Sequence, residues 1–501
     1  MAKTGLDLIS TADIARLAGQ SRATVGNWKA RNPDFPPERG RGPRGPLYDR
    51  AEVTRWLEST SRLDKQSHEV AVIWSVADQL RGDMRTEDAL SLVLVLLAVM
   101  SKSSPGDWRR IRQTPPQDLE KVLRSSALSL FPFADDLIPR RPLRPESLAR
   151  VIELLSQFDR SHVSRMTDAL LEHTAKAMGR RGGEYISPPS VRRLVVAIAQ
   201  PVGSVYNPAS GIGQLMIDAA VSAGSAALEV IGQEINSRVW AMSQLNLAIH
   251  DVRAEIALGD VFDDDHYPQL RANRVVAVPP WNQRLPIVER LPGDPRWVWG
   301  EPSPNDGNVA WIQHCLYHLA EDGRAVLVLP NNVLFESGRA GRIRQRLVKA
   351  GLLDAVLALP PGLFAFTSLP CTVLVFAKGR PSVDGKPAPT LMVDLRESSD
   401  GRTTRSATLD DELIGQVARL YSDWRAGAEP TTEISAIARF DDLAANDFII
   451  DPGRYISLPI STPDPDEAIH QRAELLDRLQ RLSQASRDAD EQLNLILGAR
   501  R

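Results

Sequence analysis

Residues 205–220 read VYNPASGIGQLMIDAA. This pattern predicts a short strand, a turn that contains glycine, and the start of a helix. Glycine at such a turn lets the backbone approach a ligand closely and direct amide groups towards it. Because a single Gly-x-Gly is more often an ordinary tight turn, its role has to be judged from the sequence around it.

Short β-rich runs alternate with helical segments on the carboxyl side of this turn. That alternation is typical of a doubly wound α/β sheet. The last run comes after its predecessor with only a loop between them, so we expect a mostly parallel sheet with one reversed strand. The runs are VYNPA, EVIGQE, EIALGD, RVVAV, AVLVLP, AVLALP and TVLVFA.

Acidic residues stand at the ends of the next two predicted strands. Glu234 lies in GQEIN and Asp260 in GDVF. A carboxylate at the second strand end suits the hydroxyl groups of a ribose, and one at the third suits the amino group of an adenine ring. Together with the turn, these acids predict a site for a nucleoside cofactor.

The following strand ends in VPPW, residues 278–281. Two prolines stiffen this loop, and Trp281 places an aromatic ring at the same edge of the sheet. The alternative for Trp281 is packing in the core. The candidate catalytic group is Val278, Pro279, Pro280 and Trp281.

The first 60 residues predict a small separate module. STADIARLAGQSRATVGNWKA predicts two short helices, RGRGPRGPLY a hairpin, and DRAEVTRWLE a further helix. Between residues 16 and 50, eight Lys or Arg accompany three Asp or Glu, which is a local excess of positive charge. We interpret the module as a winged helix-turn-helix that binds double-stranded DNA, the alternative being a protein-docking helical module. The candidate DNA contacts are Arg22, Thr24, Asn27, Lys29, Arg39, Arg41 and Arg44.

The remaining segments are mostly helical by their patterns. Residues 73–102 have helical periodicity with almost no breakers, and prolines near 105, 115 and 139–145 divide the next part of the chain into several helices. Apolar residues at 3–4 spacing after residue 466 predict a helix that docks on a partner, or on a second copy of the chain, unless it packs on its own protein. The expected divisions are 1–60 for the head, 66–170 for a helical domain, 171–380 for the sheet domain, 381–460 for its C-terminal extension, and 466–501 for the docking helix.

The motifs together resemble the methylation subunit of type I restriction-modification systems, over about residues 70–460. The resemblance is carried by GEYISPPSVRRLV, VYNPASGIGQLMIDAA, GQEINSRVWAMSQLNLAIH, GDVF, VPPW, and the stretch from GNVAWIQHCLYHLAEDGRAVLVLPNNVLF to LPPGLFAFTSLPCTVLVFAKG. It implies a class I methyltransferase fold, S-adenosylmethionine as cofactor, methylation of adenine N6 in DNA, and specificity and restriction subunits as partners. Only the head is foreign to the family's usual pattern.

The resemblance also implies roles for individual residues. Glu234 holds the ribose of the cofactor, Asp260 meets its adenine ring, and Trp281 stacks on a target adenine rotated out of the duplex. The implied cofactor-binding set is Tyr185, Ser187, Asn207, Ala209, Gly211, Gly213, Glu234 and Asp260.

Two positions depart from the family pattern. The catalytic loop of the family begins with Asn or Asp, whose oxygen accepts a hydrogen bond from the adenine amino group, whereas Val278 accepts nothing. The family usually has Asp where this chain has Asn207, which keeps an acceptor but loses the charge. A catalytically impaired relative that acts as a DNA-binding regulator or assembly subunit is therefore the alternative function.

Composition excludes several other classes of protein. Charged residues make up 25% of the chain and hydrophobic residues 43%, and no apolar run approaches the about 20 residues of a membrane span. Two cysteines and an N-terminus without a secretory signal predict a reducing bacterial cytoplasm, near the nucleoid. His314, Cys315 and His318 predict a packed helix rather than a metal site, because no further ligands accompany them in the sequence.

Overall fold

The chain divides into two compact units, Met1–Tyr455 and Ile456–Arg501. The predicted docking helix falls in the second unit and, apart from Gln484, lies outside the described residues. The computed structural model describes residues 8–60 except 19 and 43–44, residue 484, and residues 72–456 except 74, 77–78, 81–82, 141–142, 179–184, 225–226, 286–292, 366 and 398–406.

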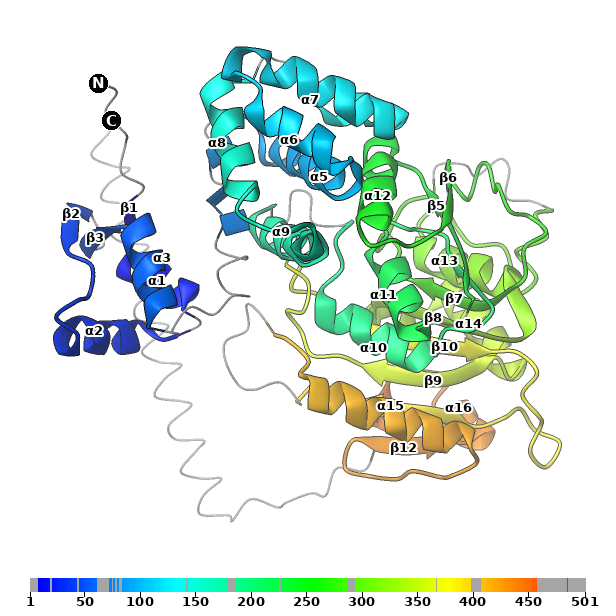
Figure 1. Cartoon of the computed structure of the whole chain (residues 1–501). Coiled ribbons are helices and arrows are strands. Elements are labelled where there is room, and N and C mark those ends of the chain that lie inside the picture. Colours follow the sequence, from blue (N-terminus) through cyan, green and yellow to red (C-terminus); the bar gives the residue numbers. More distant parts are fainter. Residues whose placement is uncertain are drawn as a thin grey trace, which may run out of the picture. The chain divides into compact units, whose positions relative to one another are not determined.

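Nine strands form one twisted sheet with the order β12-β11-β9-β10-β8-β7-β4-β5-β6 (Figure 1). Strands β8, β7, β4, β5 and β6 are parallel to their neighbours in this run. Strand β10 is antiparallel to both β8 and β9, so the predicted reversed strand is confirmed. The strands are β4 (Ser204–Asn207), β5 (Glu229–Glu234), β6 (Glu255–Leu258), β7 (Ala272–Ala277), β8 (Leu319–Pro330), β9 (Leu353–Ala358), β10 (Cys371–Ala377), β11 (Thr390–Asp394) and β12 (Ser435–Ala438).

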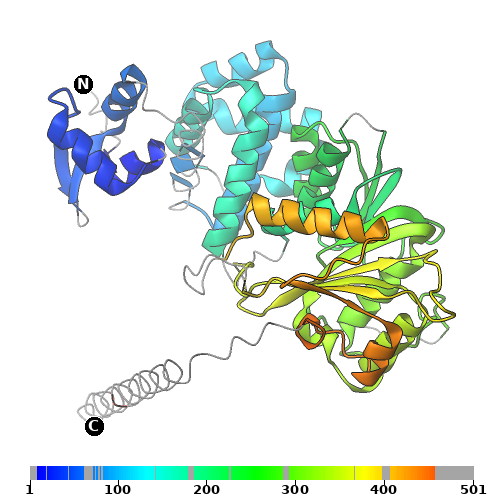
Figure 2. The same ribbon diagram turned by 90° about the horizontal axis from the view of Figure 1, so that it is seen from below.

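Both faces of the sheet are buried, as its nearly continuous apolar strands require. In β8, Ala325, Leu327 and Leu329 pack into one core, and Val326 and Val328 into the other. This alternation results from the period of two residues in a strand. Figure 2 shows α15 lying along the sheet. Helices α13 (Gly307–Tyr317) and α14 (Gly338–Lys349) contribute to the first core, and α10 (Pro189–Ala199), α11 (Gln214–Ala223) and α15 (Asp411–Arg425) to the second.

The order of the sheet reverses between β4 and β7. The chain runs outward from β4 through β5 to β6 on one side, and through β7 to β8 on the other. Loops that leave the carboxyl ends of two such strands diverge, which opens a crevice between them. The turn of residues 207–213 and the VPPW loop leave the sheet at this point.

Prolines begin four of the described α-helices that precede the sheet, including α10 at Pro189, because the first position of a helix needs no amide hydrogen. Helices α6, α7 and α8 start at Pro105, Pro116 and Pro145, so the predicted division into several helices is confirmed. Among the described helices, none has both the length and the apolarity needed to cross a membrane. The bounds are α5 (Thr86–Lys102), α6 (Pro105–Gln113), α7 (Pro116–Leu130), α8 (Pro145–Leu155) and α9 (Val163–Met178).

The unbroken helical pattern over residues 73–102 is interrupted in the structure. A turn at Asp83 and Met84 precedes α5. The carboxylate of Asp83 accepts a hydrogen bond from the Ser147 hydroxyl at 2.6 Å and pairs with Arg144 at 3.2 Å. These tertiary contacts at the start of α8 outweigh the local helical preference.

The helical segment and the sheet share a hydrophobic core. Helix α5 packs along α12 (Ser237–Ile249), where Leu92 and Leu96 belong to the same buried cluster as Leu245. At the edge of this contact, Arg238 donates to the carboxylate of Asp88 at 2.7 Å. The packing therefore holds α5 against the helix that covers β5 and β6.

The N-terminal 60 residues contain the predicted helices and hairpin, and an additional short strand. Ser21 begins the second helix by accepting the Thr24 amide hydrogen at 3.1 Å, and Val25 is buried beneath it. The three strands form an antiparallel sheet in the order β1-β3-β2. The elements are β1 (Leu8–Ser10), α1 (Thr11–Leu17), α2 (Arg22–Arg31), β2 (Glu38–Gly42), β3 (Gly45–Asp49) and α3 (Arg50–Ser59).

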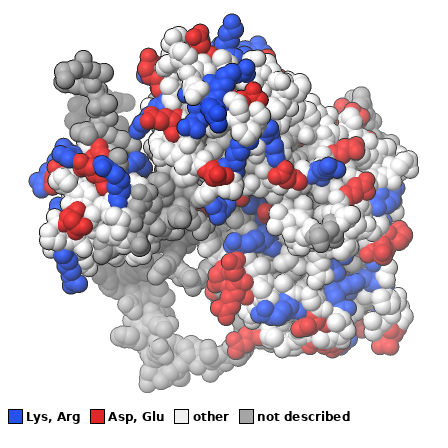
Figure 3. All heavy atoms as spheres, viewed as in Figure 1, with Lys and Arg blue, Asp and Glu red and all other residues white. Residues whose placement is uncertain are grey.

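Surface charges of both signs are interspersed on the face drawn in Figure 3. Lys and Arg lie beside Asp and Glu over most of that face. This distribution fits the net charge of −3. Any surface that binds nucleic acid must therefore be a local one.

A buried charge cluster joins β9 to the C-terminal extension. Asp354 is fully buried and pairs with Arg380 at 3.1 Å and with Arg425 at 3.3 Å. The Tyr421 hydroxyl donates to the same carboxylate at 2.5 Å. The Asp354 carboxylate thus compensates the charge of the buried Arg380 guanidinium. Its contacts with Tyr421 and Arg425 also attach α15 to the sheet.

Asp354→Ala should destabilise the fold strongly, because it leaves Arg380 buried without a carboxylate. Removing one partner of a buried pair costs about 3–5 kcal/mol of the free energy of unfolding. The matched control is Glu321→Ala, which removes an exposed partner of Lys378. Thermal denaturation followed by circular dichroism should show a large fall in midpoint for the first variant and almost none for the second. Equal midpoints would contradict this account.

Candidate active site

One pocket lies at the reversal point of the sheet, where β4 and β7 end. It contains six of the residues predicted from the sequence, from three separate segments of the chain. The lining residues are Tyr185, Ser187, Asn207, Ala209, Ser210, Gly211, Gln214, Leu215 and Val278.

Gly211 is required by a close contact across the pocket. Its φ of 54° is in the left-handed region, and a Cβ there would lie 2.7 Å from the carbonyl oxygen of Tyr185. The next amide, of Ile212, donates to that carbonyl at 3.5 Å. Gly213, with φ of 78°, then begins α11. The turn and the segment that starts at Tyr185 are therefore packed against each other.

A buried arginine holds the segment of residues 185–188 in place. Arg192, only 6% exposed, donates to the Ser187 carbonyl at 2.7 Å and to the Asp218 carboxylate at 2.7 Å. This links the segment to α10 and α11. The sequence analysis missed Arg192, which a helical pattern alone does not distinguish from an exposed neighbour.

Glu234 is joined directly to the glycine turn. Its carboxylate accepts the Gly211 amide hydrogen at 2.9 Å and the Asn236 amide hydrogen at 2.9 Å. Burial raises the pKa of Glu234, although these two backbone donors oppose that shift. Asp260 lies outside the lining of the pocket and accepts the Phe262 amide hydrogen at 2.9 Å.

The asparagine and alanine positions of the turn are also connected. The Asn207 side chain is 2% exposed, and its oxygen accepts the Ala209 amide hydrogen at 3.1 Å. Asn207 thus shapes the turn itself, in addition to lining the pocket.

Ser210 and Gln214 are pocket residues that the sequence analysis missed. They are 5% and 6% exposed, and neither the Ser210 hydroxyl nor the Gln214 carbonyl has a hydrogen-bond partner among the described residues. Buried polar atoms normally have partners. Two unpartnered atoms in the lining therefore indicate a pocket built for a polar ligand.

The first residue of the VPPW loop lines the pocket, whereas its last residue packs against the sheet. Val278 lines the pocket, Pro279 is buried, and Pro280 is exposed. The indole N–H of Trp281 donates to the Val328 carbonyl at 3.1 Å, and its ring packs edge-on against Phe364 at 4.8 Å. Trp281 therefore packs on β8 in this structure, and its stacking on a base stays a prediction.

Three asparagines fix the loop directly after Trp281, and the sequence analysis missed them. The side-chain oxygen of Asn282 accepts hydrogen bonds from Asn308 at 2.8 Å and from Asn332 at 3.1 Å. The backbone N–H of Asn282 donates a hydrogen bond to the side-chain oxygen of Asn308 at 2.9 Å. Asn308 lies in α13 and Asn332 in the segment after β8. The three asparagines are therefore far apart along the chain, and no local sequence pattern predicts their contact.

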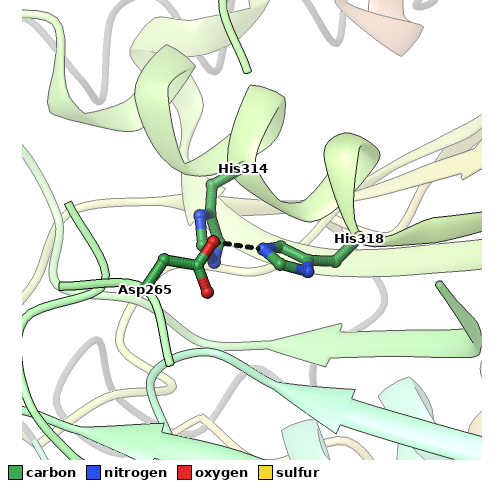
Figure 4. A group of neighbouring side chains, drawn as sticks. All are labelled: Asp265, His314 and His318. Carbon is green, nitrogen blue, oxygen red and sulfur yellow. Dashed lines mark hydrogen bonds and ion pairs between the residues drawn. The ribbon is translucent and has the colours of Figure 1, made fainter. Parts of the chain in front are cut away.

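His314 and His318 meet Asp265 in a buried group on the first face of the sheet (Figure 4). His318 Nε2 lies 3.0 Å from the Asp265 carboxylate, and its Nδ1 lies 3.3 Å from the Leu270 carbonyl. The pKa of Asp265 is lowered, because the hydrogen bond and charge of His318 outweigh the effect of burial. Both ring nitrogens of His318 therefore face acceptors.

The environment of His314 disfavours a metal ion. Arg296, which can only donate, lies 3.2 Å from His314 Nδ1, so that nitrogen accepts and Nε2 carries the proton towards the Tyr206 hydroxyl at 3.3 Å. A metal ligand would instead need an acceptor at its second nitrogen. Although Asp265 supplies a third candidate ligand that spacing did not reveal, the group favours packing, as predicted for this helix.

The residues of the head that were predicted to contact DNA differ in their exposure and in the hydrogen bonds and ion pairs that their side chains form. Arg22, Asn27 and Lys29 are exposed on α2, while the Thr24 hydroxyl is within 2.9 Å of the Ser21 hydroxyl that begins the helix. The Arg39 guanidinium is held by the Glu52 carboxylate, with its Nε at 3.1 Å, so Arg39 is a weaker candidate than the sequence suggested. Arg41 lies 3.4 Å and Lys29 3.8 Å from the Glu38 carboxylate, and Arg44 lies outside the described residues.

Two relatives from curated proteins match the chain. The type I restriction enzyme HindI methylase subunit of Haemophilus influenzae is 29% identical over 299 residues, which are 57% of this chain and 66% of that protein. The type I restriction enzyme MjaIX methylase subunit of Methanocaldococcus jannaschii is 26% identical over 353 residues, or 65% of this chain and 63% of that protein. The chain thus spans slightly less than two thirds of the length of these relatives.

A solved structure has a similar fold. The type I restriction-modification system methyltransferase subunit from Streptococcus thermophilus aligns with a TM-score of 0.66 and 20% identity, covering 79% of this chain and 100% of that one. The class I methyltransferase fold expected from the motifs is therefore confirmed. Residues 159–462 match the family model described as N-6 DNA Methylase, which is more than half of the chain. With the turn, the acid and the VPPW loop gathered at one edge of the sheet, the chain belongs to the N-6 DNA methylase family.

Proposed function

We propose that this protein transfers a methyl group from S-adenosylmethionine to the N6 amino group of adenine in DNA, as the modification component of a restriction-modification system. The observation that carries the proposal is the pocket at the reversal point. It joins Val278, at the start of the loop that would receive the base, to the glycine turn that would receive the cofactor.

The pocket fits the chemical groups of S-adenosylmethionine. Glu234 offers carboxylate oxygens to the ribose hydroxyls, and Asp260 lies beyond the next strand, where the adenine ring would be held. The Ser210 hydroxyl and the Gln214 carbonyl, which lack partners among the described residues, would meet the polar amino-acid end of the cofactor. Tyr185 lines the same pocket. Bound there, the cofactor supplies an electrophilic methyl group on sulfur. The other residues that we propose to bind the cofactor are Ser187, Asn207, Ala209, Gly211 and Gly213.

The chain's own contribution to the reaction is mainly positioning. The carbonyl of Pro279 is the acceptor that the VPPW loop retains for the adenine amino group. Trp281 would have to leave its contact with the Val328 carbonyl, or present its ring face from that position, to stack on the base. The asparagines around Asn282 hold the loop against α13 during this step.

Val278 favours a second candidate function. Without an acceptor at this position, the site loses one positioned polar group, which typically costs about 10²–10³ in rate. A relative that binds DNA and cofactor with little transfer would then act as a regulator or assembly subunit. The retained glycine turn, the connected Glu234 and the unpartnered pocket atoms favour the enzyme.

Partners and domain roles derive from the same proposal. The relatives named above are subunits of restriction enzymes, and we infer that specificity and restriction subunits assemble with this chain. Residues 1–60 act as the winged helix-turn-helix, with exposed Arg22, Asn27 and Lys29 towards DNA. Residues 66–170, 171–380 and 381–460 would form the helical domain, the methyltransferase domain and its extension, while the docking role predicted for 466–501 falls outside the described residues apart from Gln484.

Gly211→Ala should weaken binding of S-adenosylmethionine by at least about tenfold, since its Cβ would displace the Tyr185 carbonyl from the edge of the pocket. Gly224→Ala is a matched control, because Gly224 also has a positive φ, of 62°, but a Cβ there meets nothing within 4 Å. Calorimetry of the full chain should give a changed Kd for the first variant only. Equal dissociation constants for both variants would show that the contact does not shape the cofactor site.

Val278→Asn should create or greatly raise methyl transfer, because it restores the missing acceptor with a side chain of similar volume. Radiolabelled methyl transfer to genomic DNA measures the rate, while calorimetry should give the same cofactor affinity for wild type and variant. Trp281→Ala is the control that removes stacking. Rapid transfer by the wild type would show that the Pro279 carbonyl suffices, and inactivity of both proteins with bound cofactor would favour the second candidate function.

A further inference from the structure

Helix α14 carries a row of positive charge along its exposed side. Residues 339, 342, 346 and 349 are spaced by three, four and three positions, which places them on one stripe of a helix. All four are exposed, whereas Ile343, Leu347 and Val348 pack into the core beneath the sheet. The members of this basic row are Arg339, Arg342, Arg346 and Lys349.

No acidic side chain of the described residues neutralises the basic row. None of the ion pairs in the described part of the chain, all within 4.0 Å, involves any of its four members. Arg346 donates to the Trp299 carbonyl at 2.9 Å, and Lys349 lies 5.1 Å from the centre of the Phe448 ring. These contacts orient the two side chains but leave their charge uncompensated. Because like charges at this spacing destabilise a helix, the row is costly unless an anionic partner binds it.

The basic row follows closely, along the chain, a segment that contacts the end of the loop that would receive the base. Helix α14 comes after the segment Asn331–Leu334 at the carboxyl end of β8. In that segment, Asn332 donates to Asn282, the residue directly after Trp281, at 3.1 Å. Phe335, between the segment and the helix, is 52% exposed. The first member of the row is thus seven residues beyond a direct contact with the residue that follows the VPPW loop.

We propose that the basic row of α14 binds the phosphate backbone of the DNA duplex next to the rotated base. The inference rests on the proposed function and adds to it a surface that the cofactor and base sites do not include. Ten residues of helix span about 15 Å, and phosphates of one strand recur about every 3.4 Å along a duplex axis. The row is therefore long enough to meet several phosphates. An acidic protein surface would match its charge but would not explain why it begins at the base loop.

The test compares two double variants of the full chain. Arg339→Gln with Arg342→Gln removes the half of the row nearest the base loop. Arg253→Gln with Arg419→Gln is the matched control: it removes the same charge from two exposed arginines, one beyond α12 and one on α15. Binding of each protein to a nonspecific fluorescent duplex is measured by anisotropy at several salt concentrations. Residues 1–60 are unchanged in both, so any DNA contact by the head is the same.

Loss of two phosphate contacts should weaken binding by about ten- to a hundredfold at low salt and reduce the slope of log affinity against log salt by about two. The control should behave as the wild type. If the variant in α14 has the wild-type slope, the proposal is overturned, and the row then belongs to a protein partner or to solvent. If the wild type itself binds neither duplex DNA nor S-adenosylmethionine, the proposed function fails first. Cofactor affinity equal to wild type in both double variants excludes misfolding as the cause of a changed slope.

Discussion

The site depends on one close approach, between Gly211 and the carbonyl oxygen of Tyr185. A side chain at position 211 would lie 2.7 Å from that oxygen, so only glycine lets the two segments meet. The same glycine donates its amide hydrogen to Glu234, which brings the end of β5 to the turn. Three separate parts of the chain are thus fixed around the end of β4. Arg192 donates a hydrogen bond to the Ser187 carbonyl and so holds the segment of residues 185–188 in place.

The reversal of strand order explains why the VPPW loop and the glycine turn meet at one pocket. They leave neighbouring strands, β4 and β7, whose helices lie on opposite faces of the sheet. The two loops therefore diverge and leave a crevice between them. The asparagines around Asn282 join the end of the VPPW loop to α13 and to the segment Asn331–Leu334 that follows β8. Positioning of this kind is the main contribution a protein makes to in-line group transfer.

The sequence predicted the parts of the fold that are encoded locally. Strand runs, the glycine turn and the helix-starting prolines depend on neighbours along the chain, and the reversed strand was evident from a short connection. The interruption at Asp83 was not predictable, since it depends on contacts with Ser147 and Arg144 from another helix. Strands β11 and β12 were missed because β11 pairs with β9 and β12 with β11, and both pairings join residues that are distant along the chain. In the site, Ser210 and Gln214 became visible only when burial left their polar atoms without partners.

Modification-sensitive sequencing of DNA tests the central claim most directly, using cells with and without this protein. If the glycine turn binds S-adenosylmethionine and the VPPW loop receives adenine, as proposed, N6-methyladenine should occur at a recurring short sequence only in cells that contain the chain. Methyl transfer that is slowed by Val278 can still modify the DNA, because a full cell generation is available for the reaction. Replacing Gly211 by Ala in those cells should lower the fraction of sites that are modified. Identical adenine modification in cells with and without the protein would contradict the account.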